Sequence, residues 1–136
     1  MSHTITSKYL GQLRTESVHL KSQSVVITDA PTDNNGKGEA FSPTDLLSTS
    51  LATCMFTIMG IVANKNQLNI DNTGCKVTKI MSSNLPRKVV EIVIEFDFPT
   101  NDFDENQKEL LRQAAYSCPV ALSLHSDLKK TVIFNF

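Results

Sequence analysis

The chain has few cysteines and lacks the short motifs that mark several large classes of enzyme. Only 3 of its 136 residues are cysteine, too few for the disulfide scaffold of a small secreted domain. No CxxC, HExxH, GxGxxG, Walker or GxSxG motif occurs, and the 3 histidines lie far apart in the sequence. These absences remove the usual support for a metal site, a nucleotide cofactor or a serine nucleophile. We therefore expect chemistry that needs no metal and no cofactor.

The chain also lacks an excess of charge of either sign. It has 13 basic and 14 acidic residues, a formal net charge of −1, and the basic residues are scattered along the sequence. Nucleic acids and membranes are therefore poor candidate partners. The cysteine count is odd, and no N-terminal apolar segment begins with Lys or Arg. We accordingly expect a single domain, residues 1–136, in a reducing, cytoplasmic setting.

One long uncharged segment, Leu46–Ala63, lies in the middle of the chain. Its length is near the lower limit for a membrane-spanning helix, but Ser and Thr residues interrupt it. In the rest of the chain, apolar and polar residues alternate as in the sheets of soluble proteins. We interpret it as a central helix, apolar nearly all round, that a sheet or a second subunit covers. It should begin at Ser42–Asp45, where Ser suits the cap, Pro the first helical position and Asp a capping box.

Alternating apolar residues and turn signals predict the remaining elements. The expected strands are Thr4–Leu10, Leu13–Leu20, Ser24–Thr28, one or two within Leu68–Ser82, Val89–Phe98 and Thr131–Phe136. The expected helices after the central one run from Asp102 or Asp104 to about Ser117, and from Cys118-Pro119 to about Leu128. The turn-rich stretch after Thr28 is predicted to be a loop.

Two cysteines at helical positions are the strongest candidates for chemistry. Cys54 lies in the central helix, where we expect it to be buried, and Cys118 is expected to cap the third helix. A thiol at a helix N-terminus faces unpaired N–H groups and the positive end of the dipole, which lower its pKa. One buried thiol and one thiol whose pKa a helix N-terminus lowers suggest an attacking and a resolving sulfur. The plain alternative, a small buried hydrophobe, stays open for both and is preferred for Cys75.

Four further segments form an ordered set along nearly the whole chain. They are Tyr9-Leu-Gly-Gln-Leu-Arg14, Asp29-Ala-Pro31 with the Gly-rich loop after it, Phe41-Ser-Pro-Thr-Asp-Leu-Leu47 leading to Ala52-Thr-Cys54, and Ala114-Ala-Tyr-Ser-Cys-Pro-Val120. Together they resemble the OsmC/Ohr family of thiol-dependent peroxidases. The resemblance implies an α+β, OsmC-like fold. In it, antiparallel sheets wrap around a central buried Cys-bearing helix, in an intertwined homodimer with active sites at the interface.

The resemblance also implies roles for individual residues. Cys54 corresponds to the peroxidatic nucleophile, Cys118 to the resolving cysteine, and Arg14 to the activating arginine. The implied reaction reduces organic hydroperoxides, and more weakly hydrogen peroxide, through a Cys54 sulfenic acid and a Cys54–Cys118 disulfide. An external dithiol, lipoyl or similar, then reduces the disulfide.

A substrate pocket around the nucleophile is also expected. Met55, Phe56 and Met59 lie close to Cys54 in the sequence, and an apolar funnel formed by them would favour organic peroxides over hydrogen peroxide. The alternative is that all three are plain core residues.

One position departs from the family pattern. The family's hydroperoxide resistance enzymes carry, at the position of Thr44, a glutamate that pairs with the arginine. Asp45 is adjacent but projects about 100° further round the helix, whereas Glu39 in the preceding loop could fold in. We predict that Glu39 takes this role, with Asp45 as the alternative. The departure keeps a second hypothesis open, a non-enzymatic small-molecule-binding or redox-sensing protein on the same fold.

Overall fold

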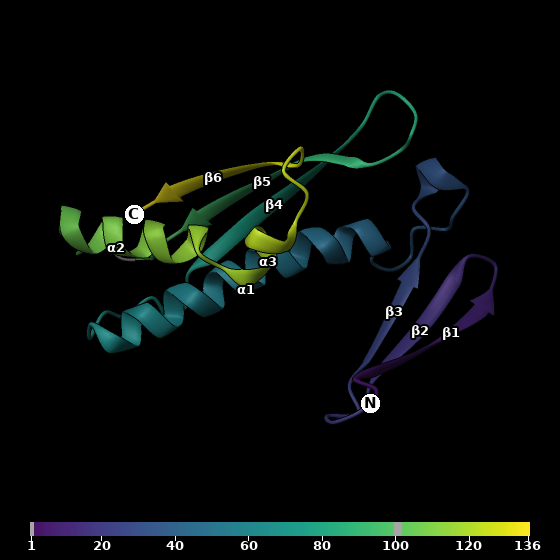
Figure 1. Cartoon of the computed structure of the whole chain (residues 1–136), viewed down its shortest axis with the longest axis horizontal. Coiled ribbons are helices and arrows are strands. Elements are labelled where there is room, and N and C mark those ends of the chain that lie inside the picture. Colours follow the sequence, from purple (N-terminus) through teal and green to yellow (C-terminus); the bar gives the residue numbers. More distant parts are fainter. Residues whose placement is uncertain (1, 100–101) are drawn as a thin grey trace. The chain divides into compact units, whose positions relative to one another are not determined.

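A computed structural model describes residues 2–99 and 102–136 and contains both helices and strands. The described chain forms two compact units, one up to Leu46 and one from Leu47 onwards. In order, the elements are β1 (Ile5–Gly11), β2 (Arg14–His19), β3 (Val25–Asp29), the short 3-10 helix η1 (Thr32–Asn34), α1 (Pro43–Lys65), β4 (Gly74–Met81), β5 (Val89–Asp97), α2 (Glu105–Tyr116), α3 (Pro119–Ser123) and β6 (Lys129–Asn135) (Figure 1).

The N-terminal unit is built on an antiparallel sheet in the order β1-β2-β3. A tight turn joins the first two strands, and it takes Gly11, Gln12 and Leu13 through positive φ angles of 90°, 53° and 64°. Among the described residues of this unit, no large apolar side chain is buried; Tyr9, for example, is 64% exposed. The sheet therefore lacks a hydrophobic core of its own, although a small sheet normally needs an apolar face packed against something.

The C-terminal unit contains a second sheet in the order β4-β5-β6. β4 pairs antiparallel with β5, but β6 pairs parallel with β5. The expectation of purely antiparallel sheets is thus wrong for this sheet. The physical reason is the connection, because α2 and α3 carry the chain back before β6 begins, and parallel neighbours need such a crossover.

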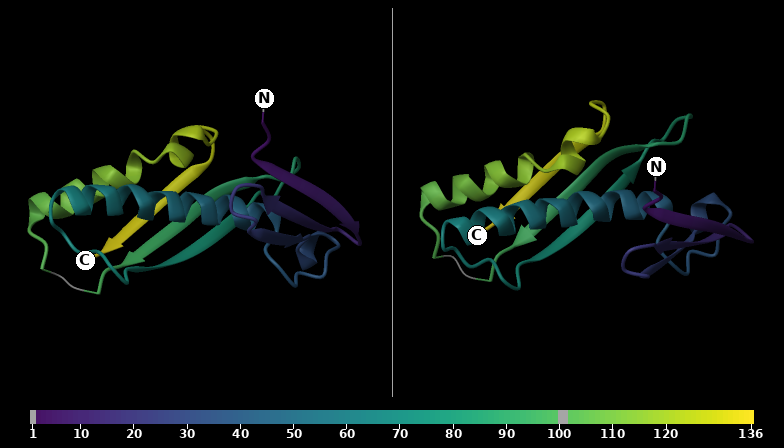
Figure 2. Two further views of the ribbon diagram at one scale, coloured as in Figure 1. Left: turned by 90° about the horizontal axis from the view of Figure 1, so that it is seen from below. Right: turned by 60° about the horizontal axis from the view of Figure 1, so that its bottom comes forward.

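The core of the C-terminal unit lies between this sheet and the helices. Ile92, Ile94 and Phe96 on β5 are fully buried, as their alternation with acidic residues predicts. α1 and α2 run along one face of the sheet (Figure 2). The ring of Phe56 on α1 meets that of Phe96 edge-on, with centroids 4.9 Å apart. Such contacts add to the free energy gained from burying apolar area.

Helix α1 begins as the sequence predicts. The backbone N–H of Ser42 donates to Asp45 Oδ2 at 2.9 Å, and the Asp45 N–H donates to Ser42 Oγ at 3.0 Å, which is a reciprocal capping box. By length and composition alone, α1 could cross a bilayer, with mean hydropathy 1.8 over its most apolar window and 33% of that window buried. Core helices of soluble proteins meet the same criterion.

One stripe of α1 is both uncharged and exposed. It consists of Thr53, Thr57, Ile61 and Asn64, which recur at helical spacing. At its centre, Ile61 is 46% exposed. An uncharged stripe with an exposed isoleucine is unusual for the solvent-facing side of a helix, which normally carries charged residues.

Helix α3 is shorter than expected, ending at Ser123 rather than near Leu128. At the last helical residue, Ser123 Oγ donates to the Pro119 carbonyl at 2.7 Å, and beyond the helix the Asp127 N–H donates to His125 Nδ1 at 3.0 Å. Short polar side chains that bond nearby backbone compete with the helix.

Candidate functional site

The structure brings Cys54 and Cys118 together within the C-terminal unit. Cys54 lies on α1 and is half-buried, whereas Cys118 is fully buried at the start of α3. Both are free thiols, and they lie close enough together for Cys54 to influence the pKa of Cys118. The extended conformation of Cys118 (φ −66°, ψ 140°) makes it the N-cap of α3, and its Sγ accepts from the Ala121 N–H at 3.2 Å. The predicted cap is therefore confirmed.

The expected contrast between the two thiols is wrong. Cys118, not Cys54, is the fully buried one, and its pKa is raised rather than lowered. Burial is the main cause, because it penalises the thiolate; the Ala121 N–H opposes the rise, and the neighbouring Cys54 thiol adds to it. The sequence pattern located the cap but did not reveal that core side chains surround it.

The third thiol remains best explained as structural. Cys75 lies on β4, directly opposite Phe96 in the β4–β5 register, and is half-buried. Burial raises its pKa, with a smaller contribution from the negative charge of Asp97. A protonated, half-buried thiol is a poor nucleophile.

Of the three predicted pocket residues, two are fully buried. Met55 and Met59 are 0% exposed and belong to the core cluster, and Phe56 packs partly buried against it. These contacts are those of core residues, the plain alternative, and a share in a substrate pocket stays a prediction.

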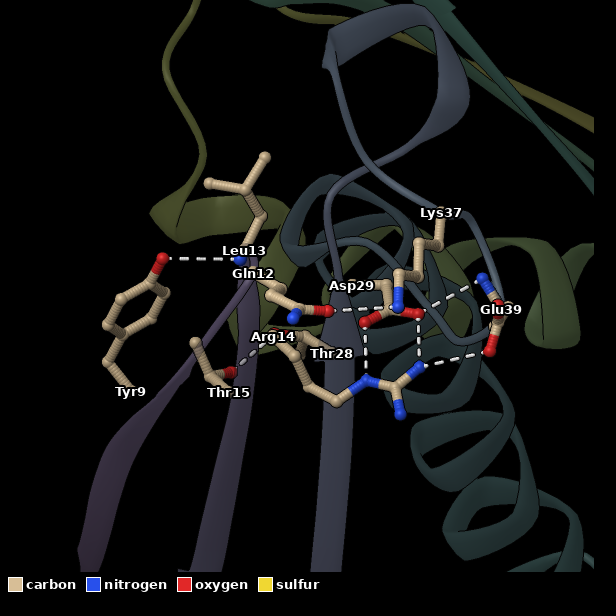
Figure 3. Close-up of polar contacts among 9 residues, drawn as sticks. All are labelled: Tyr9, Gln12, Leu13, Arg14, Thr15, Thr28, Asp29, Lys37 and Glu39. Atoms are coloured by element: carbon tan, nitrogen blue, oxygen red, sulfur yellow. Dashed lines mark hydrogen bonds and ion pairs between the residues drawn. The ribbon is translucent and has the colours of Figure 1, made fainter.

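Arg14 lies at the start of β2 and is held by acidic residues of its own unit (Figure 3). Its Nε and Nη2 donate to the two carboxylate oxygens of Asp29, each at 2.7 Å. Nη2 also donates to Glu39 Oε2, at 3.4 Å. Asp29 holds the pKa of Arg14 above its usual value, and Arg14 in turn lowers the pKa of Asp29. The Arg14 side chain is 37% exposed, but its ion pair with Asp29 distinguishes it from an unpaired strand charge.

Asp29 is the residue that the sequence reasoning missed. The turn signals predict that it belongs to the loop after the third strand, but β3 includes it and pairs it directly with Arg14 across the sheet. An opposite-charge pair at facing positions of neighbouring strands was the available signal. Of the two predicted substitutes, Glu39 does reach the guanidinium, while Asp45 is used in the α1 cap. Thr44 contacts Ser42, with their hydroxyl oxygens 3.1 Å apart.

A metal site has no candidate ligands in the part of the chain that the structure describes. Among residues 2–99 and 102–136, no three His, Cys, Asp or Glu side chains are grouped so that they could hold an ion. The chemistry that the described residues offer is therefore that of two adjacent thiols and of a guanidinium fixed by carboxylates.

Comparison with known proteins identifies the family. The family model described as "OsmC-like protein" matches residues 36–132. The chain belongs to the OsmC-like family. A crystal structure from Psychrobacter arcticus, of a candidate osmotic stress induced and detoxification response protein, is 46% identical over 99% of this chain and 97% of that one, with a TM-score of 0.94. The OsmC-like fold predicted from the sequence is thus confirmed.

More distant OsmC-like structures share the fold. An organic hydroperoxide resistance protein OsmC from Legionella pneumophila has a TM-score of 0.77 at 15% identity, covering 98% of both chains. A candidate organic hydroperoxide resistance protein from Vibrio cholerae, with captopril bound in one of its active sites, has a TM-score of 0.75 at 14% identity, covering 99% of this chain and 93% of that one. A search of curated proteins gave no match. At these identities the likeness shows a shared fold.

The raised pKa of Cys118 predicts how its reactivity depends on pH. A raised pKa keeps the sulfur as a thiol at neutral pH, so the thiolate fraction grows about tenfold for each pH unit below that pKa. If Cys118 condenses with a Cys54 sulfenic acid, as the family resemblance implies, we expect this step to accelerate as the pH rises from about 6 to about 8, a range below that raised pKa. Rapid-quench trapping of the sulfenic acid with dimedone measures this rate, and a rate independent of pH would contradict the assignment.

Proposed function

We propose that this OsmC-like protein is a thiol-dependent peroxidase that reduces organic hydroperoxides, and hydrogen peroxide more weakly. One observation carries the proposal: two free thiols on different elements, Cys54 and Cys118, lie close together within the C-terminal unit. Adjacent thiols can become a disulfide with little movement of the backbone. Cys54 is the more accessible of the two, which suits the sulfur that must meet a substrate first.

The proposed reaction has three balanced steps. The Cys54 thiolate attacks the O–O bond of the hydroperoxide, the sulfur is oxidised to sulfenic acid, and the leaving alkoxide takes a proton to become an alcohol. Cys118 then condenses with the sulfenic acid, forming the Cys54–Cys118 disulfide and releasing water. An external dithiol, lipoyl or similar, reduces this bond by two thiol–disulfide exchanges and leaves as its own disulfide.

Arg14 is proposed to stabilise the charges that develop in the first step. A guanidinium is permanently charged and offers several donors in one plane. In this chain it is oriented by Asp29 and Glu39, and we assign to it the charge that develops on the nucleophile or on the peroxide oxygens. We assign the pocket for the organic group to Met55, Phe56 and Met59.

A homodimer is proposed as the working form, in a cytoplasmic setting. Two features support it: the described N-terminal sheet has no buried large apolar side chain, and the stripe on α1 is exposed without charge. Both surfaces would gain free energy from burial at about 25 cal/mol for each Å² of apolar area. A second copy of the same chain carries the same exposed sheet and the same exposed stripe on α1. A two-fold interface uses identical surfaces of both subunits, so one such interface could bury both features.

Peroxide-dependent consumption of a dithiol tests the proposed activity. We expect the protein to consume dithiothreitol and a dihydrolipoyl donor rapidly when an organic hydroperoxide is added. Peptide mapping after mild oxidation should find one main bridge, Cys54–Cys118, with Cys75 reduced. Slow consumption with a fully formed bridge would favour the redox-sensing alternative, and a main bridge through Cys75 would contradict the assignment of the thiols.

A further inference from the structure

The carboxylate of Asp29 is unusual in this chain for its burial and for the number of donors that surround it. It is the one full charge among the buried side chains of the described residues, with its side chain 3% exposed. Besides the two donors of Arg14, the backbone N–H of Glu39 donates to Asp29 Oδ2 at 3.1 Å. A buried carboxylate is costly unless it is paired and hydrogen-bonded, and here three donors satisfy it.

The pairing fixes the direction of the guanidinium. Two parallel N–H···O bonds define the plane of the fork, which a single contact cannot do. The backbone on both sides is held as well, since Arg14 and Asp29 are direct partners in the β2–β3 register. The Asp29 N–H donates to the Phe41 carbonyl at 3.0 Å, and the Ala30 N–H donates to the Leu13 carbonyl at 3.1 Å.

Glu39 contributes much less to this orientation. Its single contact with Arg14 is 3.4 Å long, and its side chain is 64% exposed. Exposed ion pairs of this kind have small effects. The carboxylate that sets the position of Arg14 is therefore Asp29, from β3, rather than either acid that the sequence suggested.

The pairing leaves one nitrogen of Arg14 for another partner. Nε and Nη2 are engaged, whereas Nη1 makes no hydrogen bond to a described residue and points away from both acids (Figure 3). Arg14 also lines a cavity of about 180 Å³, together with Leu10, Gly11, Gln12 and Lys37. A cavity of this size has room for a small polar group.

We propose that Asp29 is a positioning residue for the peroxidase reaction, which holds the Arg14 guanidinium in one orientation and leaves Nη1 for the reaction. The inference rests on the proposed role of Arg14 and adds how that role is achieved. Asp29 itself touches no substrate. It acts through the orientation of Arg14, so its effect requires Arg14 to be present.

Kinetics of matched variants test the proposal. We expect Asp29→Asn to lower kcat/KM for an organic hydroperoxide by about 10- to 100-fold, as small misplacements of a catalytic group do. Glu39→Gln should lower it by less than about threefold, in line with the weak effect of exposed pairs. Glu16→Gln, which removes a half-buried acid from the same strand as Arg14, serves as the control and should leave kcat/KM unchanged. In an Arg14→Ala background, Asp29→Asn should have no further effect.

A second variant keeps the test decisive if Asp29→Asn does not fold. Arg14→Lys retains the charge but cannot form the two-bond fork, so the same loss of kcat/KM is expected. Full activity in Arg14→Lys would show that charge alone suffices and would overturn the proposal.

The remaining outcomes separate positioning from other roles. If Asp29→Asn speeds both peroxide turnover and alkylation of Cys54 by iodoacetamide, Asp29 merely neutralises Arg14, and the proposal is wrong. If it lowers only the melting temperature, Asp29 is structural, and the proposal is wrong again. If Arg14→Ala leaves turnover unchanged, the proposed role of Arg14 itself is wrong. If Arg14→Ala lowers turnover but Asp29→Asn does not, only the positioning role of Asp29 is wrong.

Discussion

Replacing Cys54 by serine is expected to abolish peroxide turnover, with a loss on the order of 1000-fold or more, as removal of a catalytic nucleophile typically causes. Serine keeps the size and the hydrogen-bonding capacity of the side chain, but a hydroxyl is almost entirely protonated at neutral pH and cannot cycle through sulfenic acid. The measurement is hydroperoxide-dependent oxidation of dithiothreitol, with circular dichroism to show that α1 is intact.

Two other cysteine variants complete this experiment. Cys118→Ser should still undergo the first oxidation, so dimedone should trap a sulfenic acid on Cys54 while turnover with dithiol falls. Cys75→Ser is the matched control, because its thiol is half-buried and has no proposed part in the reaction. Turnover that survives in Cys54→Ser and disappears in Cys75→Ser would reverse the assignment of the nucleophile.

Placing a charge on the exposed stripe of α1 is expected to have the second large effect. If a second subunit covers this stripe, Ile61→Lys buries an ammonium group at the interface. The cost of several kcal/mol corresponds to a dimer Kd weakened on the order of 100-fold or more. Lysine is a good helix former, so α1 itself should persist. Light scattering should find about twice the chain mass of 15.0 kDa for the parent protein and a smaller species for the variant.

The outer face of the C-terminal sheet offers a control for this substitution. Ile133 on β6 is 41% exposed, close to the 46% of Ile61, and its partner in the register is Glu95. Ile133→Lys should therefore leave the mass unchanged. A parent protein that is folded and monomeric at micromolar concentration would rule out the dimer.

Local patterns in the sequence predicted most of the fold. The alternation of β5 placed Ile92, Ile94 and Phe96 in the core, and Ser42–Asp45 correctly marked the start of α1. Each of these signals lies within a few residues, where the period of the side chains and the capping groups determine the outcome. The parallel pairing of β6 was missed, because it depends on how a long helical connection returns to the sheet.

The site was less predictable for the same reason. The cap at Cys118 is local and was found, but its burial depends on core residues distant in the sequence. The pair between Arg14 and Asp29 joins neighbouring strands, and its recognition required β3 to extend one residue further than the pattern suggested. Family resemblance suggested which thiols and which arginine matter, but it did not identify the carboxylate that orients the arginine in this chain.

The position of Cys118 at the start of α3 couples the redox state of the protein to the stability of that helix. Its sulfur accepts a hydrogen bond from the Ala121 N–H, and a sulfur bound in a disulfide turns toward its partner and accepts less well. Loss of an N-cap costs about 0.5–2 kcal/mol, and for a two-electron couple about 1.4 kcal/mol corresponds to about 30 mV. A Cys54–Cys118 disulfide would thus be more oxidising by up to some tens of millivolts. An external dithiol would reduce it more readily, and restoration of the helix cap would favour the return to the reduced protein.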